Sequence, residues 1–219
     1  MASSLELDTF AGQLAHELRT PLGQIETIAR LLLDRGDEVS DRRRWLEIQL
    51  ALTRQIEQTM HCLLELGRAQ RAPLRTEDID LSALCDRLRS DLPEGPRRGA
   101  IAWKISRGLR VRGCPAQVAL LMRNLLANAA KYTRETVHPV VAISAGVHDI
   151  TVVEDNGVGF DDAHASRLFQ PFVRLHAGSR FEGTGLGLSI ARCIVERHGG
   201  WIRARSAVGA GARFEFSLG

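Results

Sequence analysis

The sequence lacks the features that mark several common classes of protein. Its cysteines form no CxxC pair, so they predict neither a zinc site nor a disulfide framework, and a reducing cytoplasm suits them best; they are Cys62, Cys85, Cys114 and Cys193. No apolar run approaches the roughly 20 residues that a membrane-spanning helix needs, and the N-terminus has no basic and then apolar signal pattern. We expect a cytoplasmic chain without a membrane segment, and any anchor of the full-length protein would lie outside it.

Basic charge is not concentrated either. The formal net charge is +3, residues 1–72 hold nine basic against eleven acidic residues, and residues 73–219 hold 20 against 15. Nucleic-acid binding usually needs a dense basic stripe, and neither half has one. We therefore expect no nucleic-acid partner.

Lysine, asparagine and tyrosine are scarce. The chain has 27 arginines but only two lysines, three asparagines and one tyrosine. Because arginine occupies almost every position that needs only a positive charge, a lysine in this chain suggests a specific role. Four of the scarce residues lie within the single segment MRNLLANAAKYT: Asn124, Asn128, Lys131 and Tyr132. This segment is the first candidate for a functional site.

Two long apolar stripes occupy the first third of the chain. Apolar residues recur every three or four positions from Phe10 to Leu32, and again after Asp41, which predicts two amphipathic helices. The polar stretch DRGDEVSD joins them into an antiparallel hairpin, which cannot cover its own apolar faces. We expect two copies of the α hairpin to form a dimeric four-helix bundle.

The pattern changes at Pro73, which ends the second helix, so we expect a dimerisation domain over residues 1–72 and a second domain over residues 73–219. In the second domain, helices are predicted at LSALCDRLRSDL, Pro115–Tyr132 and LGLSIARCIVERHGG. Strands are predicted at IAWKIS, LRVRGC, VVAISAGV, DITVVED, WIRARSA and ARFEFSL, with an irregular Gly-rich segment after DITVVED. This order predicts an α+β sandwich, in which helices cover one mostly antiparallel sheet.

The helix Pro115–Tyr132 carries a polar stripe. Asn124, Asn128 and Lys131 are spaced i, i+4 and i+7, so they share one helix face. The opposite face carries the apolar residues Val118, Leu121, Leu125 and Leu126. Amides beside an ammonium suit a hydrated cation and a polyphosphate. The alternative is an ordinary solvated helix face, although asparagine is a poor helix former that this chain otherwise avoids.

Two glycine-containing segments follow. EDNGVGF comes directly after a strand, so Gly157 and Gly159 let the backbone beside Asp155 approach a ligand closely, although a turn with an Asx cap would explain the segment nearly as well. GTGLGLS opens a helix, and the free amides of a helix N-terminus can bind phosphate. It is neither the dinucleotide motif GxGxxG nor the phosphate loop GxxxxGK[ST].

The segments NLLANAAKYT, EDNGVGF, LFQPF and GTGLGLS occur in this order. In order and spacing they resemble the ATP-binding domain of sensor histidine kinases, a fold shared with gyrase-type ATPases, mismatch-repair ATPases and a heat-shock chaperone. The resemblance implies ATP and Mg²⁺ as cofactors, with Asn128 coordinating the magnesium and Asn124 supporting it. It also implies that Lys131 and Tyr132 face the nucleotide.

The same resemblance extends to the adenine and the triphosphate. Asp155 would accept the adenine amino group, with Gly157 and Gly159 flanking the base. The segment from Asp161 to Glu182 would be a mobile lid over ATP. The lid would have two apolar anchors and a candidate phosphate partner: Phe169, Phe172 and Arg174. The residues implied to border the triphosphate are Gly183, Thr184, Gly185, Leu186 and Gly187.

The first domain contains AHELRTPL, which resembles the phosphoacceptor box of a histidine kinase. Serine more often occupies the position of Ala15 in that box, but the reacting groups are intact. A neutral imidazole is nucleophilic, and the adjacent carboxylate of Glu17 can take up its proton as the other ring nitrogen attacks the γ-phosphorus. We therefore expect His16 to be the phosphoacceptor.

Two further residues of the box have expected roles. Thr20 lies one turn beyond His16 on the same helix face, and by the family resemblance it would position the water that dephosphorylates a partner receiver. The simpler reading is a helix threonine bonded back to a carbonyl. Pro21 has no amide hydrogen, so the helix can bend there, and we expect the bend to let the ATP-binding domain reach His16.

Together these features predict the catalytic core of a sensor histidine kinase. It would pass a phosphoryl group from ATP to His16 and then to an aspartate of a response-regulator receiver on another chain, and it has the parts for a receiver phosphatase. A gyrase-like ATPase is the first alternative, but it would need no acceptor histidine. A non-catalytic scaffold is the second, but Asn128, Asp155 and the glycine segment are intact. Whether phosphorylation runs within a subunit or across the dimer depends on the handedness of the loop near Gly36, which spacing does not reveal.

Overall fold

The computed structural model describes residues 4–34, 39–71, 73–92, 100–147, 149–175, 181 and 183–219. Contacts between Cα atoms divide the chain into two compact units, Met1–Leu64 and Glu65–Gly219. Among the residues within those ranges, no helix combines the length and the apolar character that crossing a membrane requires.

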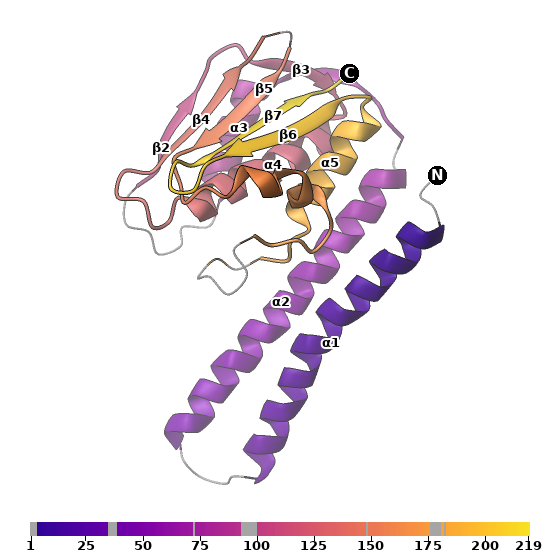
Figure 1. Ribbon diagram of the computed structural model, residues 1–219, viewed down its shortest axis with the longest axis vertical. Coiled ribbons are helices and arrows are strands. Elements are labelled where there is room, and N and C mark those ends of the chain that lie inside the picture. Colours follow the sequence, from indigo (N-terminus) through magenta and orange to yellow (C-terminus); the bar gives the residue numbers. More distant parts are fainter. Residues whose placement is uncertain are drawn as a thin grey trace. The chain divides into compact units, whose positions relative to one another are not determined.

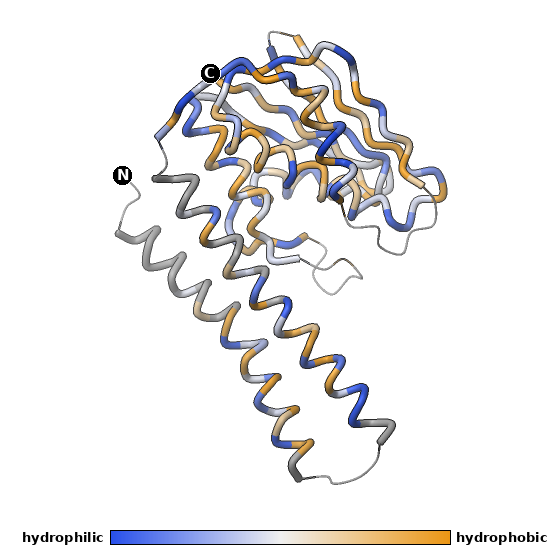
Figure 2. The backbone as a smooth tube through the Cα atoms, turned by 180° about the vertical axis from the view of Figure 1, so that it is seen from behind, coloured by the Kyte–Doolittle hydropathy of each residue, from blue (hydrophilic) through white to orange (hydrophobic). Residues whose placement is uncertain are grey.

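The first unit is built from two long helices. Helix α1 spans Ser4–Asp34, and helix α2 spans Val39–Arg71, so the end of α2, from Glu65 on, belongs to the second unit. They run side by side in opposite directions (Figure 1), and the side-chain amide of Gln49 donates a hydrogen bond to the carbonyl of Ile25 at 3.2 Å. Hydrophobic residues recur along the described lengths of both helices (Figure 2). The predicted hairpin is confirmed, and both helices extend beyond the predicted stripes.

Pro21 lies inside α1, and the helix continues past it to Asp34. Its side chain is buried. Proline has no amide hydrogen, so the hydrogen bond that the carbonyl of Glu17 would accept in a regular helix cannot form. Helix α1 is therefore continuous through a position that weakens an isolated helix.

The second unit contains a five-stranded sheet in the order β2-β4-β5-β7-β6. Its strands are β2 (Ala102–Ile105), β4 (Val140–Ala145), β5 (Thr151–Asp155), β6 (Trp201–Ser206) and β7 (Ala212–Ser217). Strands β2 and β4 pair in parallel and the other neighbours are antiparallel, so the mostly antiparallel prediction is confirmed. A separate two-stranded sheet pairs β1 (Glu77–Asp80) with β3 (Arg110–Gly113). The sequence patterns did not predict β1.

Three helices cover one face of the sheet (Figure 1). They are α3 (Leu81–Ser90), α4 (Pro115–Tyr132) and α5 (Gly187–Arg197). Asp80 caps α3, because its carboxylate accepts a hydrogen bond from the amide of Ala83 at 2.9 Å. Pro115 occupies the start of α4, as predicted from its fixed φ. The core lies between the helices and the sheet, where Leu121, Ile190 and Phe216 are fully buried.

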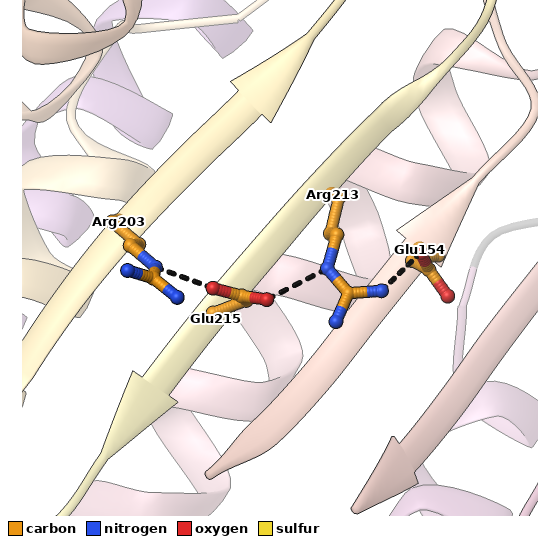
Figure 3. A network of polar contacts seen from close by, with 4 residues as sticks. All are labelled: Glu154, Arg203, Arg213 and Glu215. Atoms are coloured by element: carbon orange, nitrogen blue, oxygen red, sulfur yellow. Dashed lines mark hydrogen bonds and ion pairs between the residues drawn. The ribbon is translucent and has the colours of Figure 1, made fainter. Parts of the chain in front are cut away.

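The other face of the sheet carries a row of alternating charges (Figure 3). The Glu215 carboxylate accepts hydrogen bonds from Arg203 and from Arg213, the latter at 2.7 Å, and Arg213 also donates to Glu154 at 2.5 Å. Glu215 is only 8% exposed, and its cross-strand neighbour Val152 on the same face is 1% exposed. The paired side chains thus cover apolar surface that this face of the sheet would otherwise expose.

We predict that Glu215→Gln lowers the free energy of unfolding by about 1 to 3 kcal/mol at neutral pH, because Arg203 and Arg213 both lose their buried anionic partner. Hydrogen bonding to Arg213, followed by that to Arg203, lowers the pKa of Glu215 below its ordinary value of 4.5. Such a carboxylate stabilises the fold above that value, and its contribution is lost as the pH falls through the lowered pKa. The difference between the two proteins should therefore narrow below pH 4.5.

Urea unfolding followed by tryptophan fluorescence measures this difference. A Trp45→Phe background leaves Trp103 and Trp201 as reporters, and both lie in the five-stranded sheet. Glu196→Gln is the matched control, because its ion pair with Arg192 is about half exposed on both sides and should contribute little. Equal stability of the Glu215 and Glu196 variants would contradict the prediction.

Candidate functional site

The polar stripe of α4 lies where the sequence predicts it. Asn124, Asn128 and Lys131 are half-buried on one face. The apolar residues predicted on the opposite face are all 0% or 1% exposed: Val118, Leu121, Leu125 and Leu126. Since α4 is one rigid helix, burial of the apolar face fixes the direction of the polar one.

The glycine segment runs along this stripe. A Cβ atom at Gly183 would lie 3.1 Å from Nζ of Lys131, and one at Gly187 would lie 2.9 Å from Oδ1 of Asn124. Asn124 is held in place because its Nδ2 donates to the carbonyl of Leu120 at 3.0 Å. The glycines therefore keep the space beside the amides and the ammonium free of side chains.

The glycine segment leads into α5, which begins at Gly187, one residue after the predicted start at Leu186. The side-chain oxygen of Thr184 accepts a hydrogen bond from the amide of Leu186 at 3.3 Å. Leu186 is fully buried and precedes the helix without a side-chain cap. Its carbonyl accepts a bond of 2.8 Å from the hydroxyl of Ser189. The first turn of α5 is thereby anchored at a buried leucine next to the α4 stripe.

Gly185 joins the segment to the residues before it. It has a φ of +71°, and its carbonyl accepts a hydrogen bond from the amide of Phe172 at 3.0 Å. A Cβ at Gly185 would lie 2.7 Å from the carbonyl carbon of Phe172. Only glycine meets both demands without strain.

Asp155 ends β5, as predicted, and lies half-buried. One of its carboxylate oxygens accepts a hydrogen bond from the amide of Gly157 at 2.8 Å, so the Asx turn considered above is present. Burial raises the pKa of Asp155 to about 6, and the amides of Gly157 and Ala212 oppose that rise. The turn places a partly desolvated carboxyl group beside a closely packed backbone.

The Asp155 turn is packed against the end of α4. The carbonyl of Tyr132 accepts a hydrogen bond from the amide of Val158 at 3.2 Å. A Cβ at Gly157 would lie 2.4 Å from that same carbonyl oxygen, so a larger residue does not fit there. Two segments that are well separated in the sequence, MRNLLANAAKYT and EDNGVGF, therefore pack directly against each other.

Lys131 and Tyr132 are neighbours in space as well as in sequence. The ammonium of Lys131 lies 4.3 Å from the centre of the Tyr132 ring, which itself lies 5.2 Å from the ring of Phe181. Burial, followed by the charges of Arg174 and Arg134, lowers the pKa of Lys131 to about 8. Burial also raises the pKa of Tyr132 above its ordinary value.

The predicted lid is only partly described, since residues 176–180 and 182 lie outside the described ranges. The expectation of an irregular segment is wrong for its first part, which forms the 3-10 helix η1 (Asp162–Phe169). Asp161 caps this helix by accepting a hydrogen bond from the amide of Ala163 at 3.0 Å, a capping signal that the sequence contained. Phe169 is buried, whereas the exposed Arg174 donates to the carbonyl of Phe181 at 2.8 Å.

Sequence reasoning missed one set of contacts at the site. The hairpin between β6 and β7 packs against the residues that follow Asp155, and the hydroxyl of Ser206 accepts a hydrogen bond from the amide of Phe160 at 2.8 Å. The two glycines of SAVGAG, Gly209 and Gly211, could have predicted a tight hairpin here, because both adopt positive φ in it.

The phosphoacceptor box lies on α1. His16 and Glu17 belong to the helix, but their side chains lie outside the described part of the structure. Thr20 is exposed. The phosphoacceptor box belongs to the first unit, whereas the α4 stripe and the Asp155 turn belong to the second.

Two family models match the chain. Residues 6–72 match the His Kinase A (phospho-acceptor) domain. Residues 113–219 match the Histidine kinase-, DNA gyrase B-, and HSP90-like ATPase.

Similar proteins extend over almost the whole chain. Cyanobacterial phytochrome B of Nostoc sp. is 33% identical over 99% of this chain and 30% of that protein. The sensor-like histidine kinase SenX3 of Mycolicibacterium smegmatis is 30% identical over 95% of this chain and 56% of that protein. The chain therefore spans between about a third and a half of the length of these relatives.

A solved structure shares the fold. The histidine kinase AdeS of Acinetobacter baumannii is 20% identical, with a TM-score of 0.61 over 93% of this chain and 98% of that chain. On the two matched domains and these relatives, the chain belongs to the sensor histidine kinase family and comprises a phosphoacceptor domain followed by an ATP-binding domain.

Proposed function

We propose that this chain autophosphorylates His16 with ATP and then passes the phosphoryl group to an aspartate of a response-regulator receiver on another chain. The observation that carries the proposal is the joint presence of two features. AHELRTPL lies on α1, and the second unit brings the α4 stripe, the Asp155 turn and the glycine segment together. We take residues 1–72 as the phosphotransfer domain and residues 73–219 as the ATP-binding domain.

The proposed adenine pocket is the Asp155 turn. An ionised Asp155 accepts a hydrogen bond from the adenine amino group with the oxygen capacity that the amides of Gly157 and Ala212 leave free. Gly157 and Gly159 allow the base to approach the backbone, and Tyr132 supplies an aromatic surface nearby. The partial burial of Asp155 supports this role, since a ligand that donates a hydrogen bond compensates the desolvated carboxylate.

The proposed triphosphate site is the surface between the α4 stripe and the glycine segment. Lys131 supplies a positive charge there, and Arg174 is a second candidate cation. Close contacts at Gly183 and Gly187 keep side chains out of this surface, and the uncapped N-terminus of α5 favours negative charge. The residues proposed to border the phosphates are Gly183, Thr184, Gly185, Leu186 and Gly187.

The residues at this surface also fit magnesium. The amide oxygen of Asn128 is a hard, neutral donor of the kind that Mg²⁺ accepts beside phosphate oxygens, and Asn124 lies one turn away on the same face. Bound Mg²⁺ would neutralise negative charge on the phosphates. Asn128 would hold the ion, and Asn124, fixed by its bond to Leu120, would support it.

The proposed transfer step is an in-line displacement at the γ-phosphorus. One ring nitrogen of His16 forms the new bond to phosphorus, and the bond between that phosphorus and the oxygen of the β-phosphate breaks. ADP leaves with the electron pair of that bond. Glu17 receives the proton from the other ring nitrogen and so keeps the imidazole nucleophilic.

A homodimer is part of the proposal. The hairpin exposes large apolar side chains in both helices, and these are the surfaces that a second copy would cover. They are 47% to 57% exposed: Leu22, Leu46, Leu50, Met60 and Leu64. The α1 surface near His16 would receive the receiver, and Thr20 would position the water for dephosphorylation.

The first test is incubation of the purified chain with γ-labelled ATP and magnesium, beside the variant His16→Gln. We expect acid-labile, alkali-stable label on the wild type and none on the variant, because a phosphorylated imidazole hydrolyses in acid. Asp155→Asn is a second control that keeps the acceptor and weakens nucleotide binding. ATP hydrolysis without labelled protein would instead favour a gyrase-like ATPase, and ATP binding without either reaction would favour a scaffold.

The pH dependence of ATP affinity tests the two shifted groups. Protonation of Asp155, whose pKa is about 6, removes the acceptor for adenine, so affinity should fall below that pH. Deprotonation of Lys131, whose pKa is about 8, removes a positive charge, so affinity should also fall above that pH. On the acidic and on the alkaline limb of this pH profile, ATP affinity should fall by at most about tenfold per pH unit. Equilibrium nucleotide binding measures both limbs, and an alkaline limb that persists in Lys131→Arg would count against the role of Lys131.

A third test concerns Pro21. Pro21→Ala restores a hydrogen-bond donor to α1, so the helix should straighten and gain up to about 3 kcal/mol in stability. If the bend lets the ATP-binding domain reach His16, the ratio of kinase to phosphatase activity should change as well. Thermal unfolding and both activities are measured on the same preparation, and a stabilised variant with unchanged activities would remove the proposed role of the bend.

A further inference from the structure

The residues behind the Asp155 turn form a compact hydrogen-bonded cluster that the proposed reaction does not use. The segment from Asp155 to Phe160 lies between two backbones. On one side the carbonyl of Tyr132 contacts Gly157 and Val158. On the other side lies the hairpin from Ser206 to Gly211, which connects β6 to β7.

Backbone contacts hold the turn closely against this hairpin. The amide of Gly209 donates to the carbonyl of Val158 at 2.7 Å. A Cβ at Gly159, where φ is +62°, would lie 2.1 Å from the carbonyl oxygen of Ala207. A Cβ at Gly211 would lie 1.9 Å from the carbonyl oxygen of Asp155. At these distances the hairpin determines where the turn can lie.

One side chain connects the two segments. The hydroxyl of Ser206 accepts from the amide of Phe160 at 2.8 Å and donates to the carbonyl of Gly211 at 2.5 Å. The amide of Ser206 donates to Asp162, in η1, at 3.1 Å. Ser206 thus connects the end of the turn, the end of the hairpin and the start of η1. A hydroxyl is required, because alanine offers neither an acceptor to Phe160 nor a donor to Gly211.

We propose that Ser206 is a positioning residue for the nucleotide base, which acts by holding the turn that carries Asp155 in the geometry that accepts adenine. This inference rests on the proposed function, because it takes Asp155 as the adenine acceptor. Ser206 would not itself touch the nucleotide. Its effect is transmitted through Phe160 at one end of the turn and through Gly211, which packs on Asp155, at the other.

The position of Asp155 bears on the choice of base. Adenine presents an amino group, which a carboxylate accepts, whereas guanine presents a carbonyl oxygen at the corresponding edge, which a carboxylate repels. A turn held in one geometry imposes this difference on the ligand. A loosened turn can move its carboxylate away from a guanine carbonyl, so loss of the Ser206 bonds should weaken ATP binding and also reduce discrimination between the two bases.

The test compares Ser206→Ala with wild type by equilibrium binding of ATP and of GTP, both in a His16→Gln background so that no phosphoryl transfer intervenes. We expect the Kd for ATP to rise roughly 3- to 30-fold and the ratio of the GTP to the ATP Kd to fall. In the chain with an intact His16, autophosphorylation at saturating ATP should change little while KM rises. Ser206→Thr keeps the hydroxyl and should restore the ATP Kd.

Glu215→Gln is the matched control for stability, because it disturbs the same sheet without contacting the Asp155 turn. It should lower stability and leave both nucleotide affinities unchanged. An ATP Kd in Ser206→Ala within about twofold of wild type, or equal weakening of ATP and GTP, would overturn the positioning role. If the unaltered chain binds no ATP, the proposed function fails first, and the inference fails with it.

Discussion

The burial of one face of α4 is the constraint on which the candidate site depends. Leu121 and Leu125 pack between the helix and the sheet with almost no exposure, and burying such a side chain contributes about 1.5 to 3 kcal/mol. A single polar contact at the site contributes less, about 0.5 to 1.5 kcal/mol. Apolar packing therefore sets the rotation of α4, and the positions of Asn124, Asn128 and Lys131 follow from it.

Around this helix the site is assembled largely by close approach of backbone. Gly157 and Gly185 each lie where a side chain would collide with a neighbouring main chain. The same close packing takes the charged groups of Lys131 and Asp155 partly out of water. Burial therefore lowers the pKa of Lys131 and raises that of Asp155, so that each shift favours the neutral form of the group. The free chain thus holds two incompletely solvated groups of opposite charge, and in the proposed complex adenine would compensate Asp155 and phosphate would compensate Lys131.

Local sequence patterns predicted much of this arrangement. They did not predict the features that depend on contacts between residues far apart in the sequence. The α4 stripe, the end of β5 at Asp155 and, within one residue, the start of α5 follow from periodicity and helix signals, which act within a few residues. The strand β1 has four residues and is formed by pairing with β3, so its own sequence carried little signal. The bond from Phe160 to Ser206 joins residues 46 positions apart. Only the folded sheet brings them together.

The contact between Tyr132 and Gly157 has a consequence for ligand size. The last turn of α4 carries Lys131, and the carbonyl of Tyr132 fixes the Asp155 turn against that same turn of helix. The backbone that carries the Asp155 carboxyl group is therefore fixed, by hydrogen bonding and close packing, relative to the helix backbone that carries the Lys131 ammonium. We therefore expect this surface to favour a molecule whose hydrogen-bond donor and anionic end are spaced to reach both groups at once.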